Sequence, residues 1–287
     1  MRPGMKLSQL RYSTLKQKII QSIQHTKFRL FLPSNEKKHA GRPLAIKIID
    51  ILTLGVFWHE HGIETKKDLH DLFDLPCSYK TLVVNLNAFA TFILLLVVRL
   101  ANENRMHAHL VKYTDSTDLP VCLVKNAKRH KTMRSIASWG KTRKGWFYGL
   151  KFHLTIDAKG RVLSFSFTPG NKDDRSQFMR LNKLLAGIFV ADAGYVSAKL
   201  AREFYIEGVR ILITKPLRKM KKMATKAQHD LYSSRAFIES VFRHLKMFDG
   251  FVSSLPRSVG GYFASYFYAL AARMLSVEHE PAVLKLN

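Results

Sequence analysis

The sequence predicts an α/β protein in which helices flank a mixed β-sheet and a small all-α domain precedes the sheet. Between Leu44 and Asn104 apolar residues recur at helical spacing, and after His109 they alternate with a period of two. Two alternating strands come first, and short buried strands then alternate with helices. This order is typical of a mixed sheet whose faces are covered by helices.

The first part of the chain is predicted to be helical. Residues 1–43 form a basic N-terminal arm with a helix from Ser8 to Ile23, which either binds DNA or packs loosely. Residues 44–108 form three helices, the second capped by Thr65 and the third by Ser78. A DNA-binding helix-turn-helix and a plain helical packing domain both fit this pattern. We expect a DNA-binding role for this domain.

Residues 109–287 are predicted to form the sheet domain. The sequence Asp157-Ala158-Lys159-Gly160 supplies a turn between the second and third strands, and Pro169-Gly170-Asn171 ends the third. The C-terminal stretch Gly261–Val277 is interpreted as a helix that closes this domain. The predicted strands are His109–Thr114, Trp146–Ile156, Arg161–Phe167, Gly187–Ala191 and Val209–Thr214.

The charge of the chain predicts a polyanionic partner. Its 287 residues contain 47 Lys and Arg but only 21 Asp and Glu, which leaves a formal charge of +26. Positive side chains in such excess repel one another, and a polyanion would offset this repulsion. Nucleic acid is therefore the expected partner. The longest apolar run, Phe89–Val98, is too short to span a membrane and is interpreted as a buried helix.

Two features indicate a cytoplasmic location. Cys77 and Cys122 are isolated and lack metal-ligand spacing, so they are interpreted as core residues in a reducing compartment. The basic N-terminus has no apolar segment or cleavage site of the kind that a secretory signal needs. We therefore expect a cytoplasmic protein.

Candidate metal ligands lie at two predicted strand ends. Asp115 follows the strand His109–Thr114, and Asp192 follows Gly187–Ala191. Ligands of open sheets bind near such ends, and carboxylate oxygens suit Mg²⁺. Taken singly, each acid also fits a structural role: Asp115 in an Asx turn and Asp192 as a cap. Asp118 is the main rival to Asp115.

A third carboxylate lies on a predicted helix from Ser234 to Phe248. Arg235, Glu239, Arg243 and Lys246 are spaced by four, four and three residues, so they share one face of the helix. An ordinary amphipathic surface helix would show the same periodicity. A single acid among three cations, however, also suits a carboxylate that binds a divalent metal while the cations bind a polyanion.

Several motifs carry a family resemblance. The spacing Tyr232-x2-Arg235-x3-Glu239-x6-Lys246 resembles the Y-R-E-K signature of bacterial insertion-sequence DDE transposases. Three further segments are similar to that family, and together the motifs cover about residues 110–250. These segments are Asp115-Ser116-Thr117, Tyr148-Gly149-x-Lys151-x-His153 and Ala191-Asp192-Ala193-Gly194-Tyr195.

The resemblance implies an RNase H-like catalytic core in which Asp115, Asp192 and Glu239 form a metal-binding triad. It also implies that Tyr232, Arg235 and Lys246 contact transposon-end DNA. Only 46 residues separate Asp192 from Glu239, so we expect a compact variant without a large inserted domain. Two Mg²⁺ ions, for which Mn²⁺ can substitute, would serve the attacking and leaving oxygens of phosphodiester chemistry.

Basic stretches flank the proposed site. Nine Lys and Arg lie between Leu119 and Ile156, and seven lie between Gly208 and His229, in both cases without an acidic residue. These stretches are interpreted as a rim that binds phosphates, although solvated loops would have the same composition. Lys215, Lys151 and Arg243 are therefore further candidate DNA contacts.

These features together predict a DNA transposase that cleaves insertion-sequence ends and transfers the strand into target DNA. Its expected partner is double-stranded DNA, both the terminal inverted repeats of the transposon and the target DNA. A second copy of the chain is expected to form a homodimer in the DNA complex. The expected location is the bacterial cytoplasm, in association with the nucleoid. The alternatives are an RNase H-like nuclease without strand transfer and a catalytically inactive repressor derived from a transposase.

Overall fold

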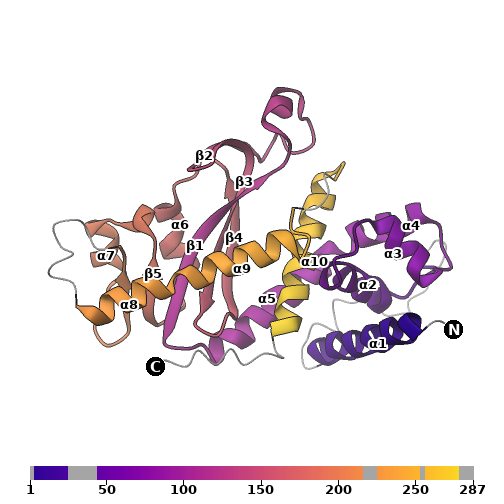
Figure 1. Cartoon of the computed structure of the whole chain (residues 1–287), viewed down its shortest axis with the longest axis horizontal. Coiled ribbons are helices and arrows are strands. Elements are labelled where there is room, and N and C mark those ends of the chain that lie inside the picture. Colours follow the sequence, from indigo (N-terminus) through magenta and orange to yellow (C-terminus); the bar gives the residue numbers. More distant parts are fainter. Residues whose placement is uncertain (1–2, 25–43, 216–224, 253–255, 278–287) are drawn as a thin grey trace. The chain divides into compact units, whose positions relative to one another are not determined.

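The computed structural model describes residues 3–24, 44–215, 225–252 and 256–277. Its described residues divide into two compact units, one formed by residues 3–24, 44–100, 245–252 and 256–277 and the other by residues 101–215 and 225–244. The elements are labelled in Figure 1.

The first unit is helical, as the sequence predicts. Thr65 caps the third helix with a capping box that includes Asp68, and the Ser78 side chain accepts a hydrogen bond from the Thr81 amide at the start of the fourth. The expected long helix from Ser78 is broken at Phe89, which leaves helical geometry. The helices are α1 (Pro3–Gln24), α2 (Ile48–Glu60), α3 (Lys66–Phe73), α4 (Tyr79–Ala88) and α10 (Val259–Val277), together with α5 (Ala90–Met106), whose last residues, from Ala101, belong to the second unit.

The core of this unit is formed where α10 packs against α2 and α4. Gly55 of α2 lies against the Tyr268 ring of α10, and a Cβ atom at this position would lie 2.2 Å from a ring carbon. His59 is fully buried, donates from Nδ1 to the Asp249 carbonyl at 2.7 Å, and has its pKa lowered to about 3 by that burial. We predicted that α10 closes the sheet domain; its apolar surface instead packs on these helices.

No single described helix has the length and hydropathy needed to cross a membrane. The pair α4 and α5 reaches these values together, with a bend of 46° between them.

The second unit contains a six-stranded sheet with the order β2-β3-β1-β5-β6, and β4 pairs with β3. β1 is antiparallel to β3, and β3 is antiparallel to β2 and β4. β5 runs parallel to both β1 and β6, so the sheet is mixed, as predicted. The strands are β1 (Val111–Pro120), β2 (Ser138–Thr142), β3 (Gly145–Asp157), β4 (Val162–Pro169), β5 (Gly187–Ala191) and β6 (Arg210–Ile213).

The strand β1 is longer than predicted. We expected it to end at Thr114, but it continues to Pro120 because these residues pair with β3 as far as Gly149. The parallel pairing with β5 does end at Thr114, opposite Ala191. Asp115 therefore lies inside a strand, at the point where that strand loses its parallel neighbour. The strand β2 was not predicted.

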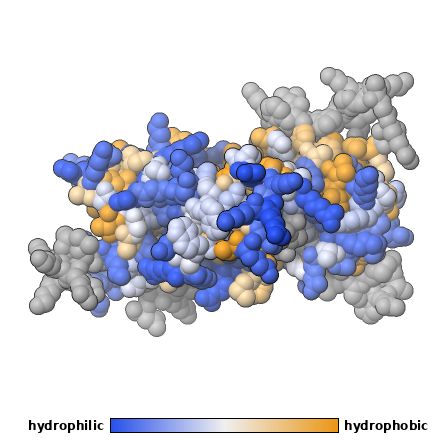
Figure 2. Space-filling model, turned by 90° about the horizontal axis from the view of Figure 1, so that it is seen from above, coloured by the Kyte–Doolittle hydropathy of each residue, from blue (hydrophilic) through white to orange (hydrophobic). Residues whose placement is uncertain are grey.

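Helices cover both faces of this sheet. On one face, Phe178 of α6 (Asp174–Asn182) and Phe204 of α7 (Ala198–Phe204) pack around Phe189 of β5. On the other face lie α8 (Lys226–Ser234) and α9 (Ala236–Met247), which run across the strands in Figure 1. Phe237 contacts Tyr113 of β1, and Phe242 contacts Phe152 of β3. In Figure 2 hydrophilic side chains cover much of the visible face, with apolar side chains between them.

Candidate active site

Asp115 and Asp192 lie on neighbouring strands of the sheet. The β1–β5 pairing ends at Thr114 and Ala191, and each aspartate is the next residue. The two carboxylates therefore meet at one edge of the parallel part of the sheet. Asp192 begins the short 3₁₀ turn η3 (Ala193–Tyr195), but its side chain makes no capping hydrogen bond there.

The segment that crosses over this edge differs slightly from the predicted single helix. Ser234 does not cap a helix; its hydroxyl donates to the Leu231 carbonyl at 2.7 Å and accepts from the Tyr113 hydroxyl at 2.9 Å. α8 therefore ends at Ser234, and Arg235 joins it directly to α9. Glu239 lies in the first turn of α9.

Arg235 links all three acidic side chains of the predicted triad. Its Nη1 donates to Oδ2 of Asp115 at 3.1 Å, and its Nη2 donates to Oε1 of Glu239 at 2.7 Å. Nη2 also lies 3.8 Å from Oδ1 of Asp192. The Tyr232 hydroxyl donates to the same Asp192 oxygen at 3.0 Å. Three acidic residues of the predicted site, Asp115, Asp192 and Glu239, thus surround the guanidinium group of Arg235.

The electrostatics of the two aspartates differ. Burial raises the pKa of Asp115 to about 7, although the Ser116 amide and Arg235 both favour its charged form. Burial also raises the pKa of Asp192, but the Ala193 amide, Arg235 and the Tyr232 hydroxyl outweigh it, so the net pKa lies below its usual value. Asp192 is therefore the more readily ionised of the pair.

The donor set suits a hard divalent cation. All three candidate ligands are carboxylates, and they already share one cationic group. Within the described residues, however, no group of three or more Asp, Glu, His or Cys side chains is arranged to hold a metal ion. Any cation that bound these carboxylates would have to displace the Arg235 guanidinium, which they already bind.

The other predicted contacts occupy different positions. Arg243 is exposed on α9, and Lys246 is half-buried in the last turn of that helix. Lys215 is exposed just beyond β6, which is parallel to β5, so it lies at the same edge of the sheet as Asp192. The basic residues Arg218, Lys219, Lys221 and Lys222 of the predicted rim lie outside the described residues.

Lys151 lies on the other face of the sheet. Its ammonium group donates to Asp174 Oδ1 at 3.0 Å and to the Lys172 carbonyl at 2.8 Å, at the start of α6. Only 16% of the Lys151 side chain is exposed. A contact with DNA would require this ammonium group to leave its present partners.

Two residues near the triad were not identified from the sequence. Arg143, at the turn between β2 and β3, has Nη2 3.8 Å from Oδ2 of Asp192 and is 89% exposed. Asp174 lies near enough to Asp115 for its negative charge to raise the pKa of Asp115. The preceding residue, Asp173, caps α6 and accepts a hydrogen bond from the Arg175 amide. The acid-free composition around Arg143 was the available signal, but nothing in it placed the turn beside Asp192.

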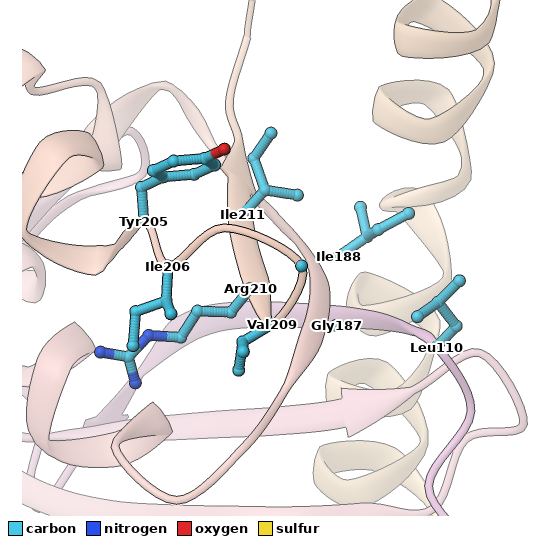
Figure 3. A pocket seen from close by; sticks show the side chains of 9 residues that line it. Leu110, Gly187, Ile188, Tyr205, Ile206, Val209, Arg210 and Ile211 are labelled. Carbon is cyan, nitrogen blue, oxygen red and sulfur yellow. The ribbon is translucent and has the colours of Figure 1, made fainter.

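A shallow cavity of about 230 Å³ lies at the opposite end of the parallel strands (Figure 3). It adjoins Gly187 and Arg210, which begin β5 and β6. No carboxylate lines it, so it is separate from the acidic site. Its apolar lining is formed by Leu110, Ile188, Tyr205, Ile206, Val209 and Ile211.

Comparisons with known proteins identify the sheet unit. Residues 105–254, more than half of the chain, match the family model described as a transposase DDE domain. No curated protein sequence matches the chain. Among solved structures, the chain is similar to a piggyBac transposase synaptic complex with hairpin DNA, with 9% identity, a TM-score of 0.47, and coverage of 88% of this chain and 71% of that one. It is also similar to a Mos1 transposase paired-end complex with the left transposon end, with 12% identity, a TM-score of 0.22, and coverage of 85% and 81%.

Proposed function

This chain belongs to the DDE transposase family, and from that membership and the geometry of the acidic site we propose that it cleaves DNA at insertion-sequence ends and joins them to target DNA. The observation that carries the proposal is the convergence of Asp115, Asp192 and Glu239 on one guanidinium group. These acids come from two strands and a helix that are far apart in the sequence. Such a gathering of acids around a cation is what a metal-dependent phosphodiester site requires.

The residues have distinct roles in this proposal. Divalent cations, for which we propose two Mg²⁺ ions or Mn²⁺ in their place, would activate the attacking oxygen and stabilise the leaving oxygen. Asp115 and Asp192 hold their carboxylates on the sheet, and Glu239 brings its carboxylate from α9. Arg235, Arg243, Lys215 and Lys246 supply positive charge for the phosphates of the transposon end, with Tyr232 beside them.

The proposed reaction has two steps at the same site. Water first attacks a phosphodiester at the end of the element, and the bond to the 3′ oxygen breaks, which leaves a 3′-hydroxyl and a 5′-phosphate. That hydroxyl then attacks a phosphodiester of the target, and the target's own 3′ oxygen leaves. One bond forms for each bond that breaks, so no external energy source is needed.

The proposed partners follow from the same reasoning. Double-stranded DNA with terminal inverted repeats is the substrate, target DNA is the acceptor, and a second copy of the chain completes a homodimeric complex. Residues 44–108 are the proposed end-recognition domain, in which Ser78 caps a helix whose Tyr79 and Lys80 are exposed. A bacterial insertion sequence is the proposed source of the chain.

The test uses purified protein, Mg²⁺ and duplexes that bear the inverted repeats flanking the gene. Wild-type protein should nick these duplexes, and Glu239→Gln should cleave about 10³-fold more slowly, because a metal-binding charge is lost from the transition state. Glu203→Gln, which removes the same charge from an exposed position on α7, is the matched control. Normal cleavage by Glu239→Gln would overturn the assignment of the triad.

A second assay separates the transposase from the nuclease alternative. A duplex with a pre-cut 3′-hydroxyl end is mixed with protein, Mg²⁺ and a supercoiled target plasmid. A transposase should join the labelled end to the plasmid. Cleavage of the uncut duplex without any joined product would favour the nuclease.

A further inference from the structure

The Arg235 guanidinium lies among the three candidate metal ligands. Its side chain is only 14% exposed, and its two terminal nitrogens reach oxygens of Asp115, Glu239 and Asp192. The contact with Glu239 is an i,i+4 pair along the helix, whereas the contact with Asp115 joins residues 120 positions apart. The guanidinium thus extends from the joint between α8 and α9 into the acidic cluster.

The oxygens that Arg235 holds are the oxygens that a cation would need. Oδ2 of Asp115 and Oε1 of Glu239 accept its hydrogen bonds, and Oδ1 of Asp192 already accepts a hydrogen bond from Tyr232. Of the remaining aspartate oxygens, Oδ1 of Asp115 accepts from the Ser116 amide, and Oδ2 of Asp192 faces Arg143. A divalent ion at this site would therefore compete with a tethered cation for the same ligands and be repelled by its charge.

A phosphate group is a suitable alternative partner for this guanidinium. Arginine binds phosphate through two parallel hydrogen bonds, in the same geometry that it uses for carboxylates. The chain carries a formal charge of +26, so a DNA backbone is drawn to it at low salt. A phosphate that takes up Arg235 would release carboxylate oxygens for metal.

We propose that Arg235 is a tethered cation that closes the acidic site to divalent metal until a DNA phosphate draws its guanidinium away. Metal and DNA then bind with positive coupling, each raising the affinity for the other by the same factor. The inference rests on the proposed function, because it takes the acidic cluster to be the metal site. Its consequence is that protein without DNA holds little metal.

The first test measures Mn²⁺ binding to the full-length chain by calorimetry in the absence of DNA. Arg235→Gln should bind Mn²⁺ about tenfold more tightly than the wild type, because the competing charge is gone. Arg180→Gln, which removes the same charge from an exposed site on α6, should bind like the wild type. Equal or weaker binding by Arg235→Gln would overturn the proposal.

The second test measures the coupling by fluorescence anisotropy with a labelled duplex of arbitrary sequence. Ca²⁺ replaces the reactive metal, and KCl keeps the ionic strength constant. Ca²⁺ should tighten DNA binding by the wild type and by Arg180→Gln several-fold, and should leave the affinity of Arg235→Gln unchanged. The ratio of affinities with and without Ca²⁺ is the readout, so a general loss of DNA affinity in the variant does not alter it.

Two controls keep the result interpretable. Arg235→Lys retains the charge but not the two-pronged geometry, so its Mn²⁺ affinity should lie between those of the wild type and Arg235→Gln. Circular dichroism and thermal unfolding establish that each variant is folded. An absence of metal binding in every variant, with or without DNA, would overturn the proposed function itself. Metal binding that does not depend on Arg235 would overturn only this inference.

Discussion

Among the acidic residues that the structure describes, Asp115 is the one whose ionisation is most strongly opposed by its surroundings. Its side chain is 17% exposed, and burial raises its pKa from 3.8 to about 7, against the opposing effects of the Ser116 amide and Arg235. Near neutral pH a large fraction of this carboxyl group is therefore protonated in the metal-free protein. A metal ligand must be ionised, so metal binding has to remove that proton.

We therefore predict that metal affinity depends on pH. The affinity of the wild type for Mn²⁺ should rise by up to about tenfold per pH unit below pH 7 and level off above it, because one proton is released on binding. Calorimetry at pH 6, 7 and 8, in buffers with different ionisation enthalpies, measures both the affinity and the released proton. An affinity that stays constant over this range would contradict the prediction.

The same pKa shift has a consequence for stability in the absence of metal. A raised pKa means that the fold prefers the protonated carboxyl, so this contribution to stability is fully present below pH 3.8 and is lost as pH rises through about 7. Asp115→Asn cannot lose a proton. Its melting temperature relative to the wild type should therefore increase between pH 6 and pH 8.

The contact between α2 and α10 depends on the absence of a side chain at Gly55. A Cβ atom there would lie within 2.6 Å of three ring carbons of Tyr268, which is itself buried. The ring cannot move freely, because its hydroxyl donates to the Leu86 carbonyl at 3.3 Å. This glycine therefore sets the distance between the two helices.

We predict that Gly55→Ala destabilises the helical unit by about 1–3 kcal/mol, the usual cost of overpacking a core. Gly260→Ala, near the start of α10, is the matched control, because no atom lies within 4 Å of the added methyl group. Its effect should be neutral or slightly stabilising, since alanine favours a helix. Urea unfolding of both variants measures the difference, and equal stability of the two would contradict the prediction.

The helices and strands show which local patterns identify an element. The strand Gly187–Ala191 was predicted with its observed ends, because the glycine and the following aspartate mark where the short apolar run begins and ends. The end of β1 was predicted wrongly, because the polar residues after Thr114 are typical of a loop. In the folded chain they pair with β3 and so continue the strand. The strand β2 was missed, because its five residues have no clear alternation.

The positive charge of the whole chain governs its expected encounter with DNA. An excess of 47 Lys and Arg over 21 Asp and Glu leaves many side chains available to contact phosphates. Contacts of this kind release counterions and do not read the base sequence. A large part of the DNA affinity should therefore be electrostatic.

We predict that affinity for a duplex of arbitrary sequence falls steeply with salt. If six or more phosphates are contacted, the association constant should drop by about 10³-fold between 50 and 200 mM salt. Anisotropy titrations at three salt concentrations give the slope of the logarithmic plot. A slope near zero would show that the charge excess does not serve DNA binding.

The sequence by itself determined the class of the fold and the positions of the acids. Alternation with a period of two marked β3 and β4, and helical spacing marked the first unit, because these periods reflect which side of an element is buried. The predicted strand ends, the helical spacing and the family resemblance all point to Asp115, Asp192 and Glu239. Local patterns were sufficient for these inferences, because each depends only on neighbours along the chain.

Only the tertiary structure decided how these residues meet. Period and spacing carry no information about which strand lies beside which, so the pairing of β1 with β5 and the packing of α10 on α2 had to come from the folded chain. The sequence placed Arg235 on a charged helix face, among residues expected to bind DNA. The fold adds that its guanidinium lies among the carboxylates of the site, because the sheet brings Asp115 and Asp192 beneath that helix.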